Sequence, residues 1–578
     1  MIGLGVAAGT DTGDAGASTH SVEFGDSHLA SDHVHECAET PPEDHADPEG
    51  DTADVVGWVG GYWYNEPLDI DDTNRLTEEE IEELTARTAA RVEALRCHTF
   101  EELPPLEFLT RDEYRDDVES SIRQSMGEED QQFADAQLAS MLLVGTEEEA
   151  KEVLIEQRAG FPAAFYNTED EVIGFITDDP DEIEIDQVTL AHELLHALQD
   201  QHFDIGTVFD EPTNDQFISS LAVVEGDAVL VDSTYAENCD LDEWPDDCIR
   251  PTPVAPGEPA SWGLTIEQLA AYHSPLVAEV KEDEGWDGVD ALLEEPPDSM
   301  VQVIDPDQRD TFEPAELSVP DRSDETWEPV ETEHGGYDRL GQHALTAILI
   351  APTFESGVEI VDVMEFQQAH AGGDFNYDIS ATDGWQGDQF HAYATDDGDV
   401  AGVWKLAWVN EAEAETFASA YEDLLAHRGG SEHDEYANVW TLEDGNWEMA
   451  VAVETDGDRL WIVTAPSVDE LSAVHGDLEL AADDKDLEER IETLEAQLEQ
   501  RDSELEQRDE RIDELEQEIE ELRELEAAVE DVLNESTADD LDELEDALEA
   551  EDESISGFGS IVAVIGLCVA AIAIRRRS

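Results

Sequence analysis

Residues 188–204 read VTLAHELLHALQDQHFD, and this stretch decides how the rest of the chain is interpreted. Its apolar residues recur at helical spacing, so it predicts a buried helix. On that helix His192 and His196 lie one turn apart on one face, where both imidazoles can bind one metal ion. Glu193 lies beside them, in a position to take a proton from a water molecule that the metal polarises. Two imidazoles, a carboxylate and an open position are typical of catalytic zinc, so we expect one zinc ion here.

The five letters HELLH do not establish a metal site by themselves. The chain has 17 His and 150 Asp and Glu residues, and a chain of this composition contains HExxH by chance in roughly one case in fifteen. The alternative is a surface helix with two solvated histidines. A third ligand is therefore needed to decide between the two interpretations.

Two residues compete for the place of third ligand. Glu225 lies 29 residues after His196, in LAVVEGDAVL, on the next predicted helix. Zinc peptidases with a glutamate ligand take it from such a helix, often in a Glu-Gly-x-Ala context that this segment matches. The rival is His202, but Gln199 stands where the HExxHxxGxxH pattern has a glycine that lets the chain turn. Without that turn His202 lies about 240° around the helix from His196, so we favour Glu225.

Other polar residues are candidates for supporting roles. Asp200 and Asp227 are expected to accept hydrogen bonds from the outer N–H groups of the histidine ligands. The alternative is that each is one more surface acid among 150. A proton donor, or a hydrogen-bond donor to the reacting oxygen, should also exist. Tyr235, His273 and His343 are candidates, and nothing in the sequence ranks them.

The composition is strongly acidic. The formal net charge is -124, from 150 acidic and 26 basic residues. Disorder is the usual cause of such a composition, but 40% hydrophobic residues and 12 Trp are enough to build a core. At molar salt the Debye length falls to about 3 Å and screens the self-repulsion, so we expect a protein of an extreme halophile. No basic patch could neutralise phosphates, which argues against nucleic acid as a partner.

The C-terminus predicts attachment to a membrane. Residues 558–574 are uncharged and reach the lower length limit of a transmembrane helix. The arginine tail 575–578 places the C-terminus in the cytoplasm and the rest of the chain on the extracellular face, at the cell surface. With Ser556, Gly557 and Phe558 this layout resembles the haloarchaeal PGF-CTERM sorting signal, with serine in place of proline. The resemblance implies that an archaeosortase removes the segment and a lipid anchor replaces it.

Residues 484–548 predict a stalk. Apolar residues recur every seven positions from about 484 to 533 between glutamate-rich flanks, which is typical of a coiled coil and of a homo-oligomer. The alternative is a low-complexity glutamate helix. Asn534 begins a glycosylation sequon, Asn-Glu-Ser.

The N-terminal residues 1–53 start like the end of a truncated signal peptide and continue as an acidic linker, which we expect to be disordered. Cys37 and Cys97 flank the start of the head, and Cys239 and Cys248 bracket a short loop. Two cysteine pairs suit disulfides in an oxidising, extracellular setting. Four reduced thiols are the alternative.

The chain between these ends has a globular, α+β pattern. We expect a mainly helical domain at 54–310, a connector at 311–339 and a second α+β subdomain at 340–480. The predicted elements are helices at 77–95, 111–126, 131–143 and 147–158, a hairpin at 163–176, strands at 403–409, 447–455 and 459–465, and a helix at 414–427.

Several stretches of the head resemble known proteins. The head resembles a family of secreted zinc peptidases found in archaea and bacteria in the stretches AFYNTEDEVIGFI, TLAHELLHALQDQHFD, EGDA and GWDGVDALLEEPPDSMVQVIDP. With its tail, the whole chain resembles a haloarchaeal family of HExxH-containing cell-surface proteins. The resemblance implies a zincin-like domain of the gluzincin type. It also implies that His192, His196 and Glu225 are zinc ligands and that Glu193 is the general base.

These observations predict a zinc-dependent metallopeptidase anchored at the cell surface, which hydrolyses peptide bonds of a peptide or protein substrate with a zinc-activated water. The alternative is a non-catalytic stalked protein of the cell envelope that retains an inactive peptidase fold. The HELLH motif with Glu225 favours the enzyme. The coiled coil and the second subdomain favour the alternative.

Overall fold

The computed structural model describes residues 37–478 and residue 501, apart from short interruptions of which 49–54, 252–258 and 369–374 are the longest. The chain forms two compact units, 1–481 and 482–578, and nearly all described residues belong to the first. The predicted signal remnant, the segment 558–574 and, apart from residue 501, the stalk with Asn534 lie outside the described residues. Among the residues that are described, no helix has both the length and the apolar character needed to cross a membrane.

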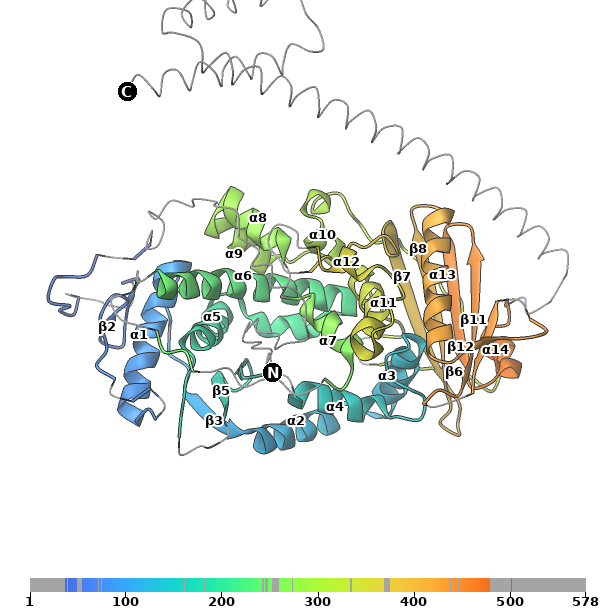
Figure 1. Ribbon diagram of the computed structural model, residues 1–578, viewed down its shortest axis with the longest axis horizontal. Coiled ribbons are helices and arrows are strands. Elements are labelled where there is room, and N and C mark those ends of the chain that lie inside the picture. The colour runs from blue at the N-terminus through green and yellow to red at the C-terminus, as the bar shows by residue number, and fades with distance from the viewer. Residues whose placement is uncertain are drawn as a thin grey trace, which may run out of the picture. The chain divides into compact units, whose positions relative to one another are not determined.

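A mainly helical part comes first in the chain (Figure 1). Its strands and helices are β1 (Trp58–Val59), β2 (Tyr62–Trp63), α1 (Glu78–Arg96), β3 (Leu106–Thr110), α2 (Arg111–Ser125), α3 (Glu128–Ser140), α4 (Ala150–Gly160), β4 (Ala164–Asn167), β5 (Val172–Thr177), α5 (Gln187–Phe203), α6 (Asn214–Asp240), α7 (Trp262–Leu269), α8 (Pro275–Glu284), α9 (Trp286–Glu294) and α10 (Met300–Ile304). The predicted helices and the hairpin of this part are confirmed, with ends that differ by a few residues.

A part that contains the larger sheet follows. Its strands and helices are β6 (Glu328–Pro329), α11 (Gln342–Ser356), α12 (Val363–Phe366), β7 (Trp385–Ala394), β8 (Val400–Trp408), α13 (Glu411–His427), β9 (Ser431–Glu432), β10 (Val439–Leu442), β11 (Met449–Asp456), β12 (Arg459–Ala465) and α14 (Val468–Val474). The predicted strands at 403–409, 447–455 and 459–465 correspond to β8, β11 and β12.

Local sequence signals determine where the first helices begin and end. Thr77 caps α1 and Glu80 returns the hydrogen bond, as the sequence predicts. The same capping box, of Thr110 with Glu113, starts α2. α1 ends at Cys97, which adopts the left-handed conformation with φ of 73°.

The two predicted disulfides are present. Cys37 joins Cys97, with Cα atoms 5.2 Å apart, and Cys239 joins Cys248, with Cα atoms 5.7 Å apart. One bridge therefore lies at the end of α1 and the other at the end of α6. Such bridges suit a protein outside the cell.

Three short strands form a sheet beside α5, in the order β3-β5-β4. β4 and β5 are the predicted hairpin and pair antiparallel, whereas β3 runs parallel to β5. Figure 1 shows β3 and β5 below α5. β4 is an edge strand of this sheet, and it packs against α5, the helix that contains HELLH.

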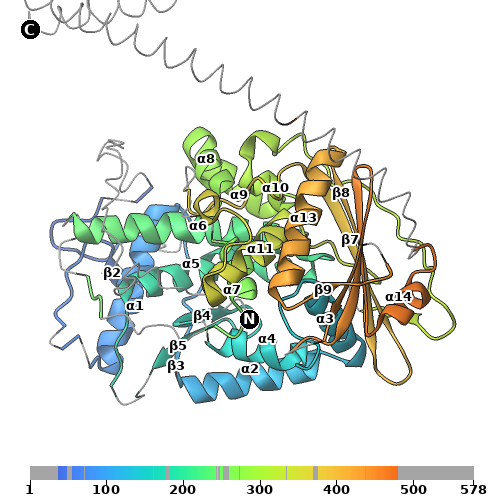
Figure 2. The same cartoon turned by 45° about the vertical axis from the view of Figure 1, so that its right-hand side comes forward.

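The larger sheet has seven antiparallel strands in the order β6-β7-β8-β12-β11-β10-β9. Successive side chains of its strands face opposite sides. Trp404 of β8 shares a core with Phe417 of α13, whereas Val403 shares another core with Leu471 of α14. The sheet therefore lies between α13 on one face and α14 on the other, as Figure 2 shows.

The predicted connector 311–339 differs from a simple linker. Glu328 and Pro329 form β6 at the edge of the larger sheet, and Asp338 bridges to Phe390 of β7. Its acidic, proline-bearing composition predicts a linker. Pairing at the edge of a sheet depends on a strand that is distant in the sequence, so composition does not reveal it. The C-terminal end of this segment therefore belongs to the sheet.

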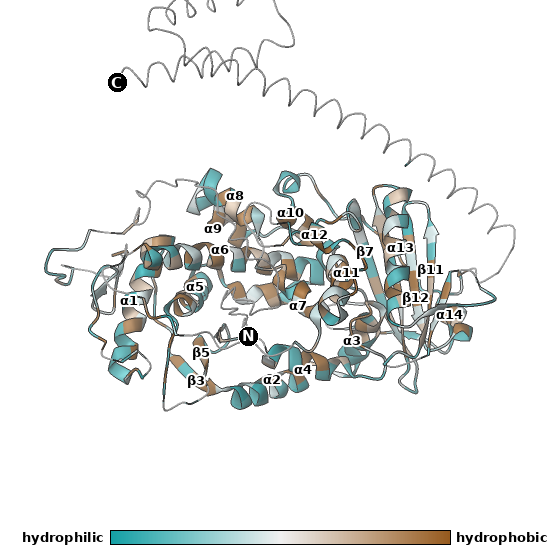
Figure 3. Ribbon diagram, viewed as in Figure 1, coloured by the Kyte–Doolittle hydropathy of each residue, from teal (hydrophilic) through white to brown (hydrophobic). Residues whose placement is uncertain are grey.

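One apolar core joins the two parts. Val224 of α6 and Leu345 of α11 belong to the same buried cluster as Phe390 of β7 and Trp404 of β8. Figure 3 shows apolar residues, in brown, along α7 and α11, where the helices meet the sheet part. The fold is therefore a mixture of helix and sheet, as the α+β prediction states.

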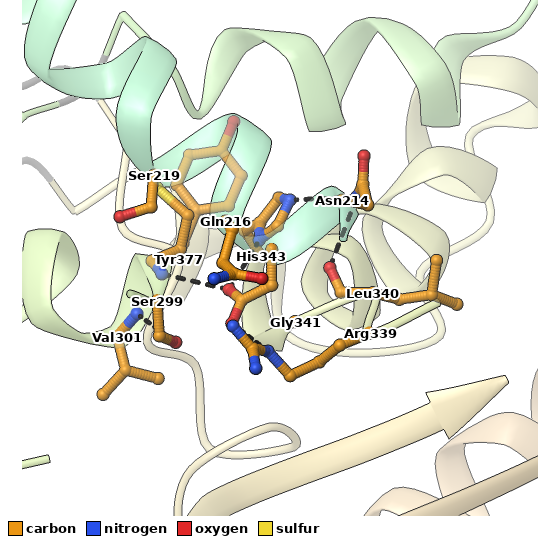
Figure 4. Close-up of polar contacts among 12 residues, drawn as sticks. Asn214, Gln216, Ser219, Ser299, Val301, Arg339, Leu340, Gly341, His343 and Tyr377 are labelled. Atoms are coloured by element: carbon orange, nitrogen blue, oxygen red, sulfur yellow. Dashed lines mark hydrogen bonds and ion pairs between the residues drawn. The ribbon is translucent and has the colours of Figure 1, made fainter. Parts of the chain in front are cut away.

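Buried polar side chains hold the first turn of α6 (Figure 4). Asp215 accepts hydrogen bonds from Arg339 Nε at 2.8 Å and from the Met300 backbone N–H at 3.0 Å. Gly341 has φ of +87° and lies so close that a Cβ there would be 2.5 Å from Asp215 Oδ1. We call Asn214, Asp215, Arg339 and His343 the junction cluster, because it ties α6 to the start of α11.

Candidate metal centre

α5 is a buried helix with a defined start. Asp186 caps it by accepting hydrogen bonds from the backbone N–H groups of Val188 and Thr189. Its apolar residues are buried, including Leu190 and Leu194, which are 0% exposed. The alternative of a surface helix with solvated histidines is therefore excluded, since His192 and His196 are also buried.

Three side chains converge on one point between α5 and α6. The nitrogen atoms His192 Nε2 and His196 Nε2 are 3.1 Å apart. Oε2 of Glu225 lies 3.3 Å from His192 Nε2 and 3.5 Å from His196 Nε2. Among the described residues this is the one group of three or more His, Cys, Asp or Glu side chains with potential ligand atoms within 4.8 Å of one another. The structure thus brings together the three ligands that the sequence predicts.

The outer nitrogen of each imidazole has its own acceptor. His192 Nδ1 lies 2.9 Å from Asp232 Oδ2, and His196 Nδ1 lies 2.9 Å from Gln199 Oε1. The amide nitrogen of Gln199 donates to the Val224 carbonyl, so the oxygen that faces His196 is an acceptor. Both imidazoles therefore carry a hydrogen on Nδ1.

These tautomers leave a site that a cation fits. When both rings are neutral, hydrogens on the two Nδ1 atoms leave the Nε2 lone pairs pointing at each other and at Glu225. At most one hydrogen fits between two nitrogens 3.1 Å apart. Both carboxylate oxygens of Glu225 are buried and without hydrogen bonds. Three electron-pair donors that face one another are a ligand set that could hold a metal ion.

The charges of the ligands affect one another strongly. Burial opposes a charge on His192 and His196, but Asp232 and Glu225 outweigh it and hold the pKa of His192 well above its usual range. The pKa of His196 is also raised, chiefly by Glu225 against burial. Burial would raise the pKa of Glu225, but the two imidazoles lower it to about 2. A metal ion that binds here would have to displace protons from the imidazoles, so its affinity would fall as the pH falls.

A second layer of contacts lies behind His196. Gln199 Nε2 donates to Asp227 Oδ2 at 2.9 Å, and Asp227 in turn accepts from Arg96 Nε at 2.8 Å. Arg96 also donates to Asp290 at 2.6 Å. The predicted role of Asp227 therefore needs correction: it supports His196 through Gln199 instead of contacting a ligand itself.

Glu193 is buried beside the three ligands but is not one of them. Its Oε1 has no hydrogen-bond partner. Burial raises the pKa of Glu193 to about 7, although His192 and His196 lower it, and a backbone hydrogen bond from Tyr166 of β4 lowers it further. A carboxylate with these properties is suited to accept a proton near neutral pH.

Several predicted residues lie elsewhere. Asp200 accepts a hydrogen bond from the Tyr166 hydroxyl at 3.0 Å, so its predicted contact with a histidine ligand is wrong. His202 Nε2 donates to the Thr99 carbonyl, away from the ligands, as its place on the helix predicts. The Tyr235 hydroxyl is occupied by Arg91 and Gln187.

The other two candidates for the hydrogen-bond donor also lie away from the ligands or cannot be placed. His343 lies in the junction cluster, 4.0 Å from Asp215. His273 lies outside the described residues. Neither therefore has an observed contact with the metal centre.

Sequence reasoning missed three residues that matter here. Asp232 lies seven residues after Glu225 and Gln199 three after His196, so helical spacing places each on the same face as its ligand. That spacing could have identified both. Tyr272, which has a buried hydroxyl near the centre, follows α7 and carries no such local signal.

Comparisons with known proteins match two segments of the chain. A domain of unknown function (DUF8575) matches residues 328–475, which run from β6 through α14 and include neither α5 nor α6. The PGF-CTERM motif matches residues 557–577, starting after Ser556. No curated protein and no solved structure matches the chain. The PGF-CTERM motif marks the chain as a haloarchaeal cell-surface protein that is anchored after archaeosortase processing, so the predicted location is confirmed.

Proposed function

We propose that this chain is a zinc-dependent peptidase of the gluzincin type on the outer surface of the haloarchaeal cell. The observation that carries the proposal is the convergence of His192, His196 and Glu225, with both Glu225 oxygens free of hydrogen bonds. Structural zinc has four protein ligands, whereas catalytic zinc has three and an open position. The ligand set therefore favours an enzyme.

The residues of the centre divide the work of peptide hydrolysis. Zinc, held by the two imidazoles and Glu225, would lower the pKa of a water to about 7 and polarise the carbonyl group of the substrate. Glu193 accepts the proton that the attacking water loses and delivers it to the amine that leaves. Its buried, unpartnered Oε1 leaves it free for this transfer.

Strand β4 offers a place for a peptide substrate. It pairs with β5 on one side only, so its other edge is where an extended peptide would add, apart from the Tyr166 N–H, which bonds to Glu193. The backbone hydrogen bond from Tyr166 to Glu193 places this edge next to the general base. An extended peptide added along β4 therefore passes the reacting groups.

The experiment compares the wild-type chain with Glu193→Gln and His196→Ala in molar salt. We expect one zinc per chain in the wild type and in Glu193→Gln, and none in His196→Ala. Casein cleavage should fall by about 10²–10⁴-fold in Glu193→Gln, because the general base is lost. His202→Ala is the matched control, since it removes a histidine of the same helix that is not a ligand.

Two results would contradict the proposal. A wild-type chain without stoichiometric zinc, or a His196→Ala variant that holds as much zinc, would exclude the metal site. A wild-type chain that holds zinc but cleaves no peptide would indicate the non-catalytic envelope protein instead.

A further inference from the structure

The hydroxyl of Tyr272 is buried and has no partner. Tyr272 lies between α7 and α8, and its side chain is half-buried as a whole. The hydroxyl oxygen itself is inaccessible to solvent, and within the described part of the chain it forms no hydrogen bond. A buried hydroxyl without a partner loses about 1–3 kcal/mol relative to one that is hydrogen-bonded. Such a group in a folded protein calls for an explanation.

The segment that carries Tyr272 packs directly against the ligand-bearing turn of α6. A Cβ on Gly226 would lie 2.5 Å from Ser274 Cβ and 3.0 Å from Val277 Cγ2. Gly226 directly follows Glu225, so the glycine allows Ser274, two residues after Tyr272, to lie close to the metal centre. Position 226 therefore requires glycine for close packing, independently of the match of Glu225-Gly226 to a motif.

Three carboxylates of the metal centre and its surroundings act on the Tyr272 hydroxyl. Burial raises its pKa well above the usual value, and the charges of Glu225, Glu193 and Asp232 raise it further. These three carboxylates belong to the metal centre and to its outer contacts. A phenol is ordinarily protonated at neutral pH, so the Tyr272 hydroxyl is a neutral hydrogen-bond donor.

We propose that the Tyr272 hydroxyl is the hydrogen-bond donor to the substrate oxygen that becomes negatively charged when water attacks the peptide carbonyl. This assignment rests on the proposed peptidase function. The hydroxyl keeps its proton throughout, so the step needs no acid or base besides Glu193. A donor without a partner in the free protein is available for an oxygen that develops charge only during the reaction.

Other tyrosine hydroxyls near the centre are not available in this way. Tyr166 donates to Asp200, and the Tyr235 hydroxyl contacts Arg91 and Gln187. Burial raises the pKa of the Tyr114 hydroxyl too, but the charges of Arg158 and Arg111 lower it and act more strongly than that of Glu193. Tyr114 is therefore the matched control for the same chemical change.

The kinetic experiment compares Tyr272→Phe with Tyr114→Phe in the full chain, in molar salt. Zinc content should be unchanged in both. For Tyr272→Phe we expect kcat to fall by about 10²–10³-fold with little change in KM, because one donor to the transition state is lost. Tyr114→Phe should stay close to the wild type. An equal loss in the two variants, or no loss in Tyr272→Phe, would overturn the assignment.

Inhibitor binding gives a readout that does not depend on turnover. A phosphinic peptide places a charged oxygen where the reacting oxygen of the substrate would lie, so Tyr272→Phe should bind it more weakly by about the factor lost in kcat. Equal affinity of Tyr272→Phe and the wild type would overturn the role of Tyr272 and leave the peptidase proposal intact. A wild-type chain that binds neither zinc nor the phosphinic peptide would overturn the peptidase proposal, and this inference with it.

Discussion

Helix α6 carries two buried polar clusters that differ in how their hydrogen bonds are satisfied. At its first turn each carboxylate oxygen of Asp215 has a donor, from the Met300 N–H and from Arg339. About three turns later both oxygens of Glu225 are buried with no hydrogen bond, and Oε2 faces two imidazole nitrogens. Both carboxylates are 0% exposed, so burial alone does not distinguish them.

The difference separates a cluster that supports the fold from one that is prepared for a ligand. A buried polar group without a partner is costly, and a fold retains it where something else will complete it. Around Asp215 the nitrogen left unpartnered is Nδ1 of His343, whose pKa burial lowers to about 3. That ring is neutral, so leaving it unpaired costs less than leaving a charge unpaired.

The largest expected effect breaks the satisfied cluster. Asp215→Ala leaves Arg339 and the Met300 N–H buried without their acceptor, so the free energy of unfolding should fall by about 3–5 kcal/mol. Denaturant unfolding in molar salt measures this. Each folded chain should still hold one zinc.

The control for that change is Asp240→Ala. It removes an exposed acid at the other end of α6, which pairs with Arg250 at the surface, and should cost under about 1 kcal/mol. Equal losses of unfolding free energy in the two variants would show that the junction cluster stabilises the fold no more than a surface ion pair does.

A smaller effect concerns the support of the ligands. Asp232→Asn replaces the charged acceptor of His192 Nδ1 by a neutral one, so the affinity for zinc should fall by about 10–100-fold. Competition with a chelator measures it. Glu237→Gln removes an equal charge from an exposed position of the same helix and should leave the affinity within about twofold. An unchanged affinity in Asp232→Asn would mean that this contact does not tune the site.

The smallest expected effect is a pH dependence. Glu193 acts as a base only when it is deprotonated, and burial raises its pKa to about 7 while His192 and His196 lower it. The positive charge of zinc lowers it further, so kcat/KM should rise with pH through a midpoint at or below 7, by less than about tenfold per pH unit. Zinc content must be measured over the same range, because protons also compete for the imidazoles.

Comparison with the junction cluster makes the pH test specific. Asp215→Asn changes a buried carboxylate that lies outside the metal centre, so the midpoint should stay where it is. A midpoint that moves in this variant would argue that the profile reports on the fold and not on Glu193.

Much of the metal centre follows from local sequence. HELLH lies on one amphipathic helix and Glu225 on the next, so periodicity together with the Glu-Gly-x-Ala context of Glu225 predicts three side chains that meet. The hairpin β4–β5 is equally local. These parts depend on contacts between neighbours in the chain.

The outer contacts do not follow from the same signals. Asp200 and Asp227 were the expected acceptors. Asp200 instead accepts a hydrogen bond from the Tyr166 hydroxyl, and Gln199 lies between Asp227 and His196. These choices depend on side chains that arrive from distant elements. Tyr272 is the extreme case, because its place depends on how α8 packs on Gly226.

The position of Asp215 on α6 limits how this protein can lose or exchange whole regions during evolution. The helix has 27 residues and spans about 40 Å. Its first turn pairs with Arg339, which lies inside the matched region 328–475. Glu225 lies on the same helix. Recombination that deleted this region would leave a buried carboxylate without its cation, on the helix that supplies a ligand. The two regions are therefore expected to be inherited together, as one cooperative unit and not as interchangeable modules.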